Sequence, residues 1–536
     1  MIFELLFSTK ICFSSPVPNG ITLAILISAT QYSQMHAPPI IPSVFLPEQC
    51  SGQQLWRALI AIALVAFSVR LAAVLAGPWA VGDAEVYANV AGNILHNFCV
   101  SMDHWAAASC TPHWGGNQLP GYPTFIALSW FAFGDSVTAP LLFQSVLFTL
   151  SICYFCWALG FYGAPPVSIW CVGLMLAFSP SLAGWSRALM TEALSSAVAL
   201  WILAEIVRSL AENRFRTWPI AIASLIGFFI RYDFVLIALP IALCALALHG
   251  AWGALRKGIA IALIVAVPFG VWTTRSVIQG LPATPPFGLS PQGHQLPQGA
   301  LAWIGTWLSH QYQLGISVWP LATETYANIA PPDEAYADDE ERKRVAFLLT
   351  HLRQIKRGEP VPGQIDDAFA ALASERIHAN PLWHYGFLPL RRMAIMWVNP
   401  AASMGWPGML GSVERADIRQ IIGRSGFLFG GIEAAVKYPA ATLSKGLTAG
   451  WRLASIVLAL FVLCLSFRES FRPYRLIIWI CLLFVATRSI AFSQTLLLET
   501  RYLTPALAWS DVAGGIGLGW LLWHLGQYRR RLKGIT

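Results

Sequence analysis

The stretch LWRALIAIALVAFSVRLAAVLAGPWAVGDAEVY, residues 55–87, places a long apolar run directly before a short acidic segment. Residues 55–76 exceed the roughly 20 apolar residues that a helix needs to cross a bilayer. Asp83 and Glu85 follow where the chain has just left the lipid, and Asp83 stands at the expected start of a helix over residues 84–97. The stretch therefore predicts a membrane-spanning helix followed by a polar segment just outside the membrane.

The rest of the chain has the same apolar character. Of its 536 residues, 56% are hydrophobic and only 12% are charged, whereas ordinary soluble domains carry about 25% charged residues. The 23 Trp and 30 Phe suit the aromatic belts of membrane proteins. This composition excludes a soluble globule, a disordered chain, collagen and a coiled coil, and it predicts an all-α polytopic membrane protein.

We interpret ten apolar runs as spans, with a range of 9 to 13 for the final count, although several are shorter than the roughly 20 residues of a perpendicular span. They are residues 55–76, 139–160, 167–178, 189–208, 218–230, 234–249, 258–273, 447–467, 476–490 and 503–524. A further run, 122–133, is too short to cross.

The net charge of +8 is explained by topology. Basic residues are retained in cytoplasmic loops, so the charge does not imply a nucleic-acid partner. With both termini cytoplasmic, the clusters at 208–216, 256–257, 468–475 and 529–533 all fall inside. The first outer loop, 77–138, then contains no Lys or Arg.

This topology divides the chain into four parts. Residues 1–54 form an N-terminal extension that is poorly ordered or an over-called start. Residues 55–273 form a transmembrane module that includes the first outer loop. Residues 274–446 form a second outer segment with a small helical domain, and 447–536 hold the last spans and a basic cytoplasmic tail.

Five arginines violate the topology rule, because they stand at the outer ends of spans: Arg187, Arg231, Arg275, Arg488 and Arg501. One interpretation is snorkelling, or ion pairs with Asp233 and Glu499. The other is an anion held at the outer membrane surface, with a lipid phosphate as the natural candidate, since guanidinium binds phosphate in a bidentate fork.

Acidic residues near the same surface have two interpretations as well. Asp83 is either an N-cap or a site residue, and helical spacing puts it on the same face as Tyr87. Glu192 lies near the start of the fourth span, so it either pairs with Arg187 or belongs to the site.

The first outer loop contains further residues that could bind or cross-link. Its histidines, His96, His104 and His113, match no zinc spacing with Asp103, so we expect no metal site there. Cys99 and Cys110 share this loop, and on the oxidising side of a membrane we favour a disulfide between them.

In order along the chain, these features resemble the GT-C glycosyltransferases that use polyprenyl-phosphate sugars. The nearest resemblance is to the bacterial group related to protein O-mannosyltransferases, aminoarabinose transferases and rhizobial galacturonosyltransferases. The matching motifs are residues 82–87 (GDAEVY) with 91–95 (AGNIL), 119–123 (LPGYP) with 133–135 (FGD), 179–180 (SP) with 191–194 (TEAL), Arg231, 378–381 (HANP) with 391–392 (RR), and 499–503 (ETRYL) with Pro505.

The resemblance implies a GT-C-like helix bundle in the bacterial inner membrane with its active site facing the periplasm. It implies inverting transfer of a sugar from a polyprenyl-phosphate donor to an acceptor hydroxyl on a lipid, glycan or protein. Asp83 would be the general base. The implied donor-phosphate ligands are Arg187, Arg231 and Arg501, and the implied orienting residues are Tyr87, Tyr122, Glu192 and Glu499.

In the implied reaction, arginines supply the positive charge that stabilises the leaving phosphate, and a divalent cation is the alternative source of that charge. Many family members carry adjacent acids where this chain has Asp83 and Ala84, so the resemblance does not extend to Glu85. Three rival functions share the membrane architecture: a lipid or glycan transporter or flippase, a ligase or polymerase with a diphosphate donor, and a non-catalytic scaffold.

Overall fold

Most of the residues that the structure describes lie in helices. The computed structural model describes residues 52–77, 83–107, 109–115, 119–283, 290, 294–398, 412–496 and 498–532, and within them the regular elements are helical. The bounds are α3 Gly52–Leu75, α4 Asp83–His96, α5 Gly121–Phe133, α6 Thr138–Phe161, α7 Pro166–Phe178, α8 Pro180–Ser186, α9 Thr191–Ala211, α10 Thr217–Ile230, η3 Tyr232–Ile237, α11 Ala238–Ile278, α12 Gln298–Gly305, α13 Gln311–Gln313, η4 Leu314–Val318, α14 Trp319–Ala322, η5 Tyr326–Asn328, η6 Asp333–Ala335, α15 Asp339–Gln354, α16 Gly363–Ala379, η7 Trp383–Phe387, α17 Leu388–Val398, α18 Ser412–Lys437, α19 Pro439–Leu465, η8 Glu469–Tyr474, α20 Arg475–Ser493, η9 Thr500–Leu503 and α21 Thr504–Leu532, with the short turn η2 at Trp105–Ala107.

The chain is a multi-pass membrane protein. Among the described residues, six helical stretches are long and apolar enough to cross a bilayer: α3, α6, α9, η3 with α11, α19, and η8 with α20. The pair α7 and α8, bent by 51° at the break before Pro180, makes a seventh if it is counted as one span. The polytopic all-α class expected from the sequence is thus confirmed.

By length and composition, six or seven stretches of the described residues qualify as spans, fewer than the ten expected from the sequence. The difference comes from three regions of the chain. The ranges 234–249 and 258–273 share α11, in which Gly250 leaves the helical conformation with a φ of 65°. Such a positive φ suits glycine, so the sequence marks a turn between two helical arms. Range 218–230 lies in α10, which has only 14 residues. Range 503–524 lies almost entirely in α21, where Asp511 and several glycines lower the hydropathy.

Close packing of small residues holds the bundle together. Helix α9 is the central span, and it contacts α6, α10 and α21. Helix α21 packs on α7 through glycines, because a Cβ at Gly515 would lie 2.7 Å from the Cα of Val172 and one at Gly519 would overlap Ser168. Small residues at this spacing let membrane helices approach closely, where dispersion contacts stabilise the pair.

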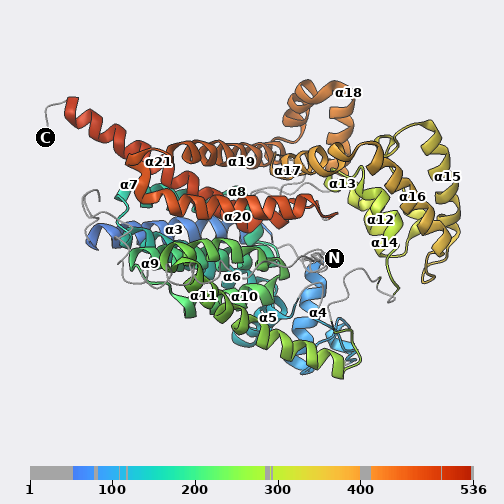
Figure 1. Cartoon of the computed structure of the whole chain (residues 1–536), viewed down its shortest axis with the longest axis horizontal. Coiled ribbons are helices and arrows are strands. Elements are labelled where there is room, and N and C mark those ends of the chain that lie inside the picture. The colour runs from blue at the N-terminus through green and yellow to red at the C-terminus, as the bar shows by residue number, and fades with distance from the viewer. Residues whose placement is uncertain are drawn as a thin grey trace, which may run out of the picture.

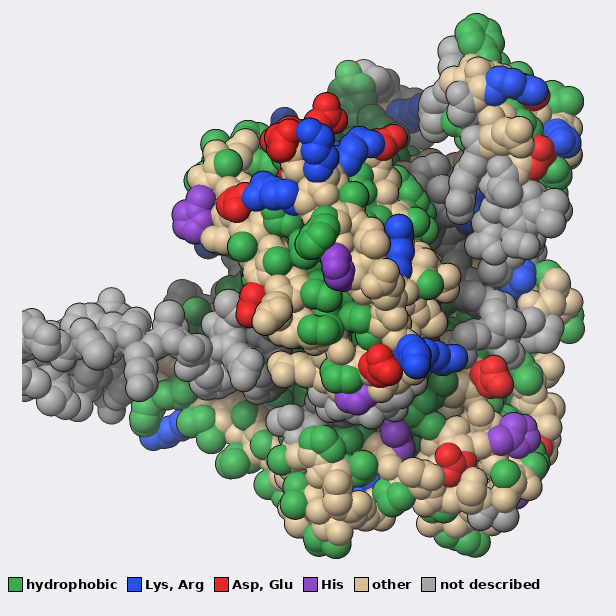
Figure 2. Space-filling model, turned by 90° about the vertical axis from the view of Figure 1, so that its right-hand side faces the viewer, with side chains coloured by type: hydrophobic (Ala, Val, Ile, Leu, Met, Phe, Trp, Pro, Cys, Tyr) green, Lys and Arg blue, Asp and Glu red, His purple; other side chains and the backbone are tan. Residues whose placement is uncertain are grey.

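A helical outer domain, α12 to α17, lies at one end of the bundle. Its helix α15 buries Val345, Leu349 and Leu352 on one face, as its sequence spacing predicts. Figure 1 shows α12, α14, α15 and α16 at the same end as α4, and the C-terminus at the opposite end. Figure 2 looks onto this end, where acidic and basic side chains gather along the upper edge. The two segments expected to be outside therefore lie at the same end of the bundle.

Arg392 in α17 joins the outer domain to the spans. Its guanidinium donates to the carbonyls of Gly305 at 2.6 Å, Leu308 at 2.7 Å and Ser493 at 3.2 Å. Helix α17 thus forms part of a buried joint between the two. The predicted N-terminal extension lies outside the described residues, apart from the start of α3.

Candidate active site

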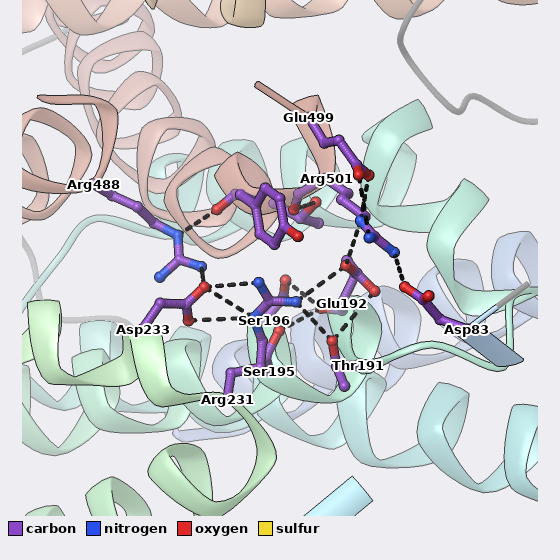
Figure 3. Close-up of polar contacts among 12 residues, drawn as sticks. Asp83, Thr191, Glu192, Ser195, Ser196, Arg231, Asp233, Arg488, Glu499 and Arg501 are labelled. Atoms are coloured by element: carbon purple, nitrogen blue, oxygen red, sulfur yellow. Dashed lines mark hydrogen bonds and ion pairs between the residues drawn. The ribbon is translucent and has the colours of Figure 1, made fainter. Parts of the chain in front are cut away.

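Four breaks between helices bring charged side chains together at the end of the bundle that carries the outer domain. The start of α4 supplies Asp83, and the start of α9 supplies Glu192. The link between α10 and α11 supplies Arg231, which has an extended backbone, and Asp233, which lies in η3. The link before α21 supplies Glu499 and Arg501. Figure 3 shows these side chains pointing toward one another from separate elements.

Arg501 lies at the centre of this charge network and contacts three carboxylates. Its Nη1 lies 2.7 Å from the Oδ2 of Asp83, and its Nε lies 2.5 Å from the Oε2 of Glu499. The same Nε lies 4.0 Å from the Oε1 of Glu192. These contacts fix the Asp83 carboxylate relative to α9 and η9, although it is 418 residues away from Arg501 in sequence.

Arg231 extends the network into the protein. Its Nη1 donates to the hydroxyl of Thr191 at 2.7 Å and to Glu192 at 3.1 Å. Its Nε and Nη2 donate to Asp233, with a shortest distance of 2.7 Å. All three guanidinium nitrogens are thus occupied, and the side chain is only 4% exposed.

Arg488 closes the network on the buried side. Its Nη2 lies 2.8 Å from the Oδ2 of Asp233, and its Nε donates to the carbonyl of Tyr502 at 2.5 Å. The network holds four carboxylates and three guanidiniums, counted over the residues labelled in Figure 3. Such pairing is what allows charges to remain buried at a membrane end.

Asp83 is the most exposed member of this network, and Asp233 and Arg501 follow at 16% each. The Asp83 side chain is 31% exposed and that of Arg501 is 16%, whereas Glu192 is 1% exposed and Arg488 is fully buried. Asp83 is therefore the carboxylate of the network most accessible to solvent. Burial raises the pKa of the Glu499 carboxyl above its ordinary value, against the opposing charge of Arg501.

A second group of polar residues positions Arg187. The rings of Tyr87 and Tyr122 meet edge to face with centroids 5.3 Å apart. The Tyr122 hydroxyl donates to the Oε1 of Gln144 at 3.1 Å, and the Nε2 of Gln144 donates to the carbonyls of Ser186 and Ala188 at 3.0 Å. These bonds hold the backbone on both sides of Arg187.

The side chain of Arg187 itself differs from the other site arginines. Within the described residues it makes no ion pair, and its buried Nε has no hydrogen-bond partner. Burial lowers the pKa of its guanidinium from the ordinary value. The alternative in which Arg187 pairs with Glu192 is wrong, because Glu192 pairs with Arg231 instead. The ion pairs considered for Asp233 and Glu499 are confirmed.

The remaining predicted residues lie apart from this network. Arg275 donates to the carbonyl of His113 at 2.7 Å, and Glu85 is exposed on α4. His96 pairs with Asp135 at 2.8 Å. Among the described residues, no group of three or more His, Cys, Asp or Glu could hold a metal ion.

A disulfide in the first outer loop and a buried amide in α6 are two further features of this end of the bundle. The structure joins Cys99 to Cys110 by a disulfide. Gln144 was not identified from the sequence. The signal was available, because it is the lone amide in the apolar run 139–160, and a buried amide in a span needs polar partners.

The fold and the site together define a polytopic helical membrane protein with a largely buried charge network, of which Asp83 is the most exposed member. No protein-family model matches the chain, and no curated protein matches it. Its fold is similar to that of an oligosaccharyltransferase from Archaeoglobus fulgidus in the apo form, at 12% identity and a TM-score of 0.43, covering 91% of this chain and 52% of the other.

The chain thus spans about half the length of that oligosaccharyltransferase. It is also similar to ArnT from Cupriavidus metallidurans bound to undecaprenyl phosphate, at 13% identity and a TM-score of 0.35, covering 88% of this chain and 78% of ArnT. The apo state of ArnT aligns over the same shares at 14% identity and a TM-score of 0.35. At these values the likenesses assign no residue, substrate or activity to this chain.

Proposed function

We propose that this chain is a membrane glycosyltransferase that moves a sugar from a polyprenyl-phosphate donor to an acceptor hydroxyl, with inversion at the anomeric carbon. The observation that carries the proposal is the arrangement around Asp83. A partly exposed carboxylate is held by Arg501 at 2.7 Å, at the end of the bundle where the spans meet the outer domain. General-base catalysis requires such a positioned carboxylate within hydrogen-bond reach of the acceptor.

In the proposed reaction, Asp83 accepts the proton of the acceptor hydroxyl while the hydroxyl oxygen forms a bond to the anomeric carbon. The bond between that carbon and the phosphate oxygen breaks on the opposite face. Its electron pair leaves with the polyprenyl phosphate, which needs cationic stabilisation rather than a strong general acid. Arg501 keeps Asp83 in place during this exchange.

Arg187 is the arginine best suited to the donor phosphate. Its guanidinium makes no ion pair within the described residues, so it has donors to offer an anion. Arg501 contributes positive charge beside Asp83 and stays the second candidate. The occupied donors of Arg231 favour a role in positioning Glu192 and Asp233 over direct contact with the phosphate.

The orienting roles follow the same geometry. Tyr87 and Tyr122 support the segment of Arg187 through Gln144. Glu192 and Glu499 hold Arg501 on two sides. We place a divalent cation outside the proposed mechanism, because the carboxylates of the network are shared among arginines; adding EDTA to the transfer reaction tests this choice.

We further propose that the site faces the periplasm of a bacterial inner membrane, with residues 274–446 forming an outer domain and both termini in the cytoplasm. The basic clusters at the far ends of the spans support this orientation. Reporter fusions at the C-terminus and within residues 290–298 should report opposite sides.

Product analysis separates the transferase from its rivals. Purified protein is incubated with a labelled polyprenyl-phosphate sugar and candidate acceptors. The proposal predicts free polyprenyl phosphate as a product. Movement of intact donor across a vesicle membrane would indicate a flippase, and release of polyprenyl diphosphate from a diphosphate donor would indicate a ligase or polymerase.

A further inference from the structure

The outer domain contains a cavity that the proposed active site does not use. It has a volume of about 220 Å³ and is lined by Thr306, Ala337, Arg376, Ala379, Asn380, Trp383 and His384. Two of these residues belong to the motif at 378–381, to which the mechanism gives no role. Ligand pockets for drug-sized molecules measure about 300–1,000 Å³, so this cavity suits a smaller, ring-sized group.

The charges at the cavity are compensated within the protein. The Nη1 of Arg376 donates to the carbonyl of Ala335 at 2.7 Å and lies 3.3 Å from the Oε1 of Glu341. Burial, and then the charge of Arg392, lower the pKa of His384, so its imidazole is neutral at pH 7. A cavity with one neutralised arginine and a neutral histidine favours a neutral ligand over a phosphate or a carboxylate.

The polar atoms that remain suit hydroxyl groups. His384 lines the cavity with its imidazole ring. A neutral imidazole offers one donor and one acceptor nitrogen, and a hydroxyl group can serve either. Asn380 uses its Oδ1 to accept from the backbone of Trp383 at 3.0 Å, which leaves its amide nitrogen as a donor at the cavity.

The cavity also has an aromatic side chain in its lining. Trp383 lines the cavity and is 40% exposed, so an area of its indole is open to a ligand. A flat apolar ring beside a few hydrogen-bonding groups matches a molecule with an apolar face of C–H bonds and an edge of hydroxyls. Among the neutral ligands of this size, a pyranose ring has both features.

We propose that this cavity binds one neutral sugar ring of the acceptor. The inference rests on the proposed function in that it names the acceptor as a glycan, carried by a lipid or by a protein. The cavity then holds a part of the acceptor remote from the reacting hydroxyl, and such binding positions the acceptor without joining in the chemistry.

The test measures sugar binding directly. The full chain is reconstituted in phospholipid nanodiscs, because alkyl maltoside detergents carry sugar rings that would compete. Saturation-transfer NMR then gives dissociation constants for methyl glucoside, methyl galactoside and methyl mannoside, and phosphorus NMR follows inorganic phosphate. We expect at least one methyl glycoside to bind and phosphate not to compete with it.

Variants locate that binding. Loss of the aromatic contact in Trp383→Ala should raise the dissociation constant about 2- to 12-fold, and His384→Phe should raise it by a similar factor of about 2- to 12-fold through the lost hydrogen bond. Tyr385→Ala is the matched control, because this neighbouring ring is 66% exposed and does not line the cavity. Thermal unfolding of each variant checks that the fold is kept.

Two results would overturn the inference: no methyl glycoside binds the wild type, or Trp383→Ala and Tyr385→Ala bind it equally. The outcome is independent of catalysis, because Asp83→Asn should bind the glycoside as the wild type does. Sugar binding without transfer by the wild type would refute the proposed function alone. Transfer without sugar binding would refute the inference alone. Glycolipid and glycopeptide arms, competing against the bound glycoside, identify the carrier.

Discussion

Replacement of Arg231 by methionine tests whether the buried charge network holds the site together. The substitution keeps an unbranched chain and removes the guanidinium. Among the described residues, Glu192, 1% exposed, would then keep Arg501 as its cationic partner, with the Nε at 4.0 Å, and the hydroxyl of Thr191 at 3.4 Å. Asp233 would keep Arg488 at 2.8 Å. Breaking a buried pair on one side costs about 3–5 kcal/mol, so we expect a loss of stability of this size.

The matched control is the same substitution at a surface pair. Arg342 lies 3.0 Å from Asp333, with side chains 48% and 90% exposed. Exposed pairs contribute about 0–1 kcal/mol, so Arg342→Met should change little. The assay is SDS titration in mixed micelles, with helicity followed by circular dichroism.

A double variant sharpens the same test. Glu192→Gln combined with Arg231→Met removes both buried charges of the pair, so the combined loss should be smaller than the sum of the two single losses. If Arg231→Met were no more destabilising than Arg342→Met, or if the losses simply added, the network would not be the energetic unit that its contacts indicate.

Two further predictions concern the donor and the first outer loop. Arg187→Gln should raise the KM for the polyprenyl-phosphate sugar more than tenfold, since a charge-assisted hydrogen bond contributes about 1.5–3 kcal/mol; an unchanged KM in steady-state kinetics would remove Arg187 from the donor site. Peptide mapping without reductant should find residues 99 and 110 cross-linked in protein purified from the membrane, and alkylation of both thiols would contradict the disulfide and the oxidising location of the loop.

Much of the architecture could be predicted because it depends on local sequence. Apolar runs of sufficient length predicted the membrane helices. The number of spans was less predictable. Gly250 places a turn between the two helical arms of α11, and the break before Pro180 bends another pair, so the length of a run did not equal a crossing.

The partners within the site depend on tertiary contacts, which proximity in sequence did not reveal. Glu192 is five residues from Arg187 and yet pairs with Arg231, 39 residues away, because the start of α9 turns toward the link after α10. The pairing of Arg501 with Asp83 joins segments from opposite ends of the chain. Gln144 was overlooked because a single amide adds little to the hydropathy of a span.

The central claim is that Asp83 accepts the proton of the acceptor, and transfer by Asp83→Asn tests it most directly. Glu85→Gln is the matched control, because it removes an exposed carboxylate from the same helix two residues away. Both proteins are purified in nanodiscs and supplied with a labelled polyprenyl-phosphate sugar and acceptor. We predict that Asp83→Asn folds and loses at least about 100-fold in transfer rate, as expected for a lost general base, while Glu85→Gln transfers normally. Normal release of polyprenyl phosphate by Asp83→Asn would contradict the account.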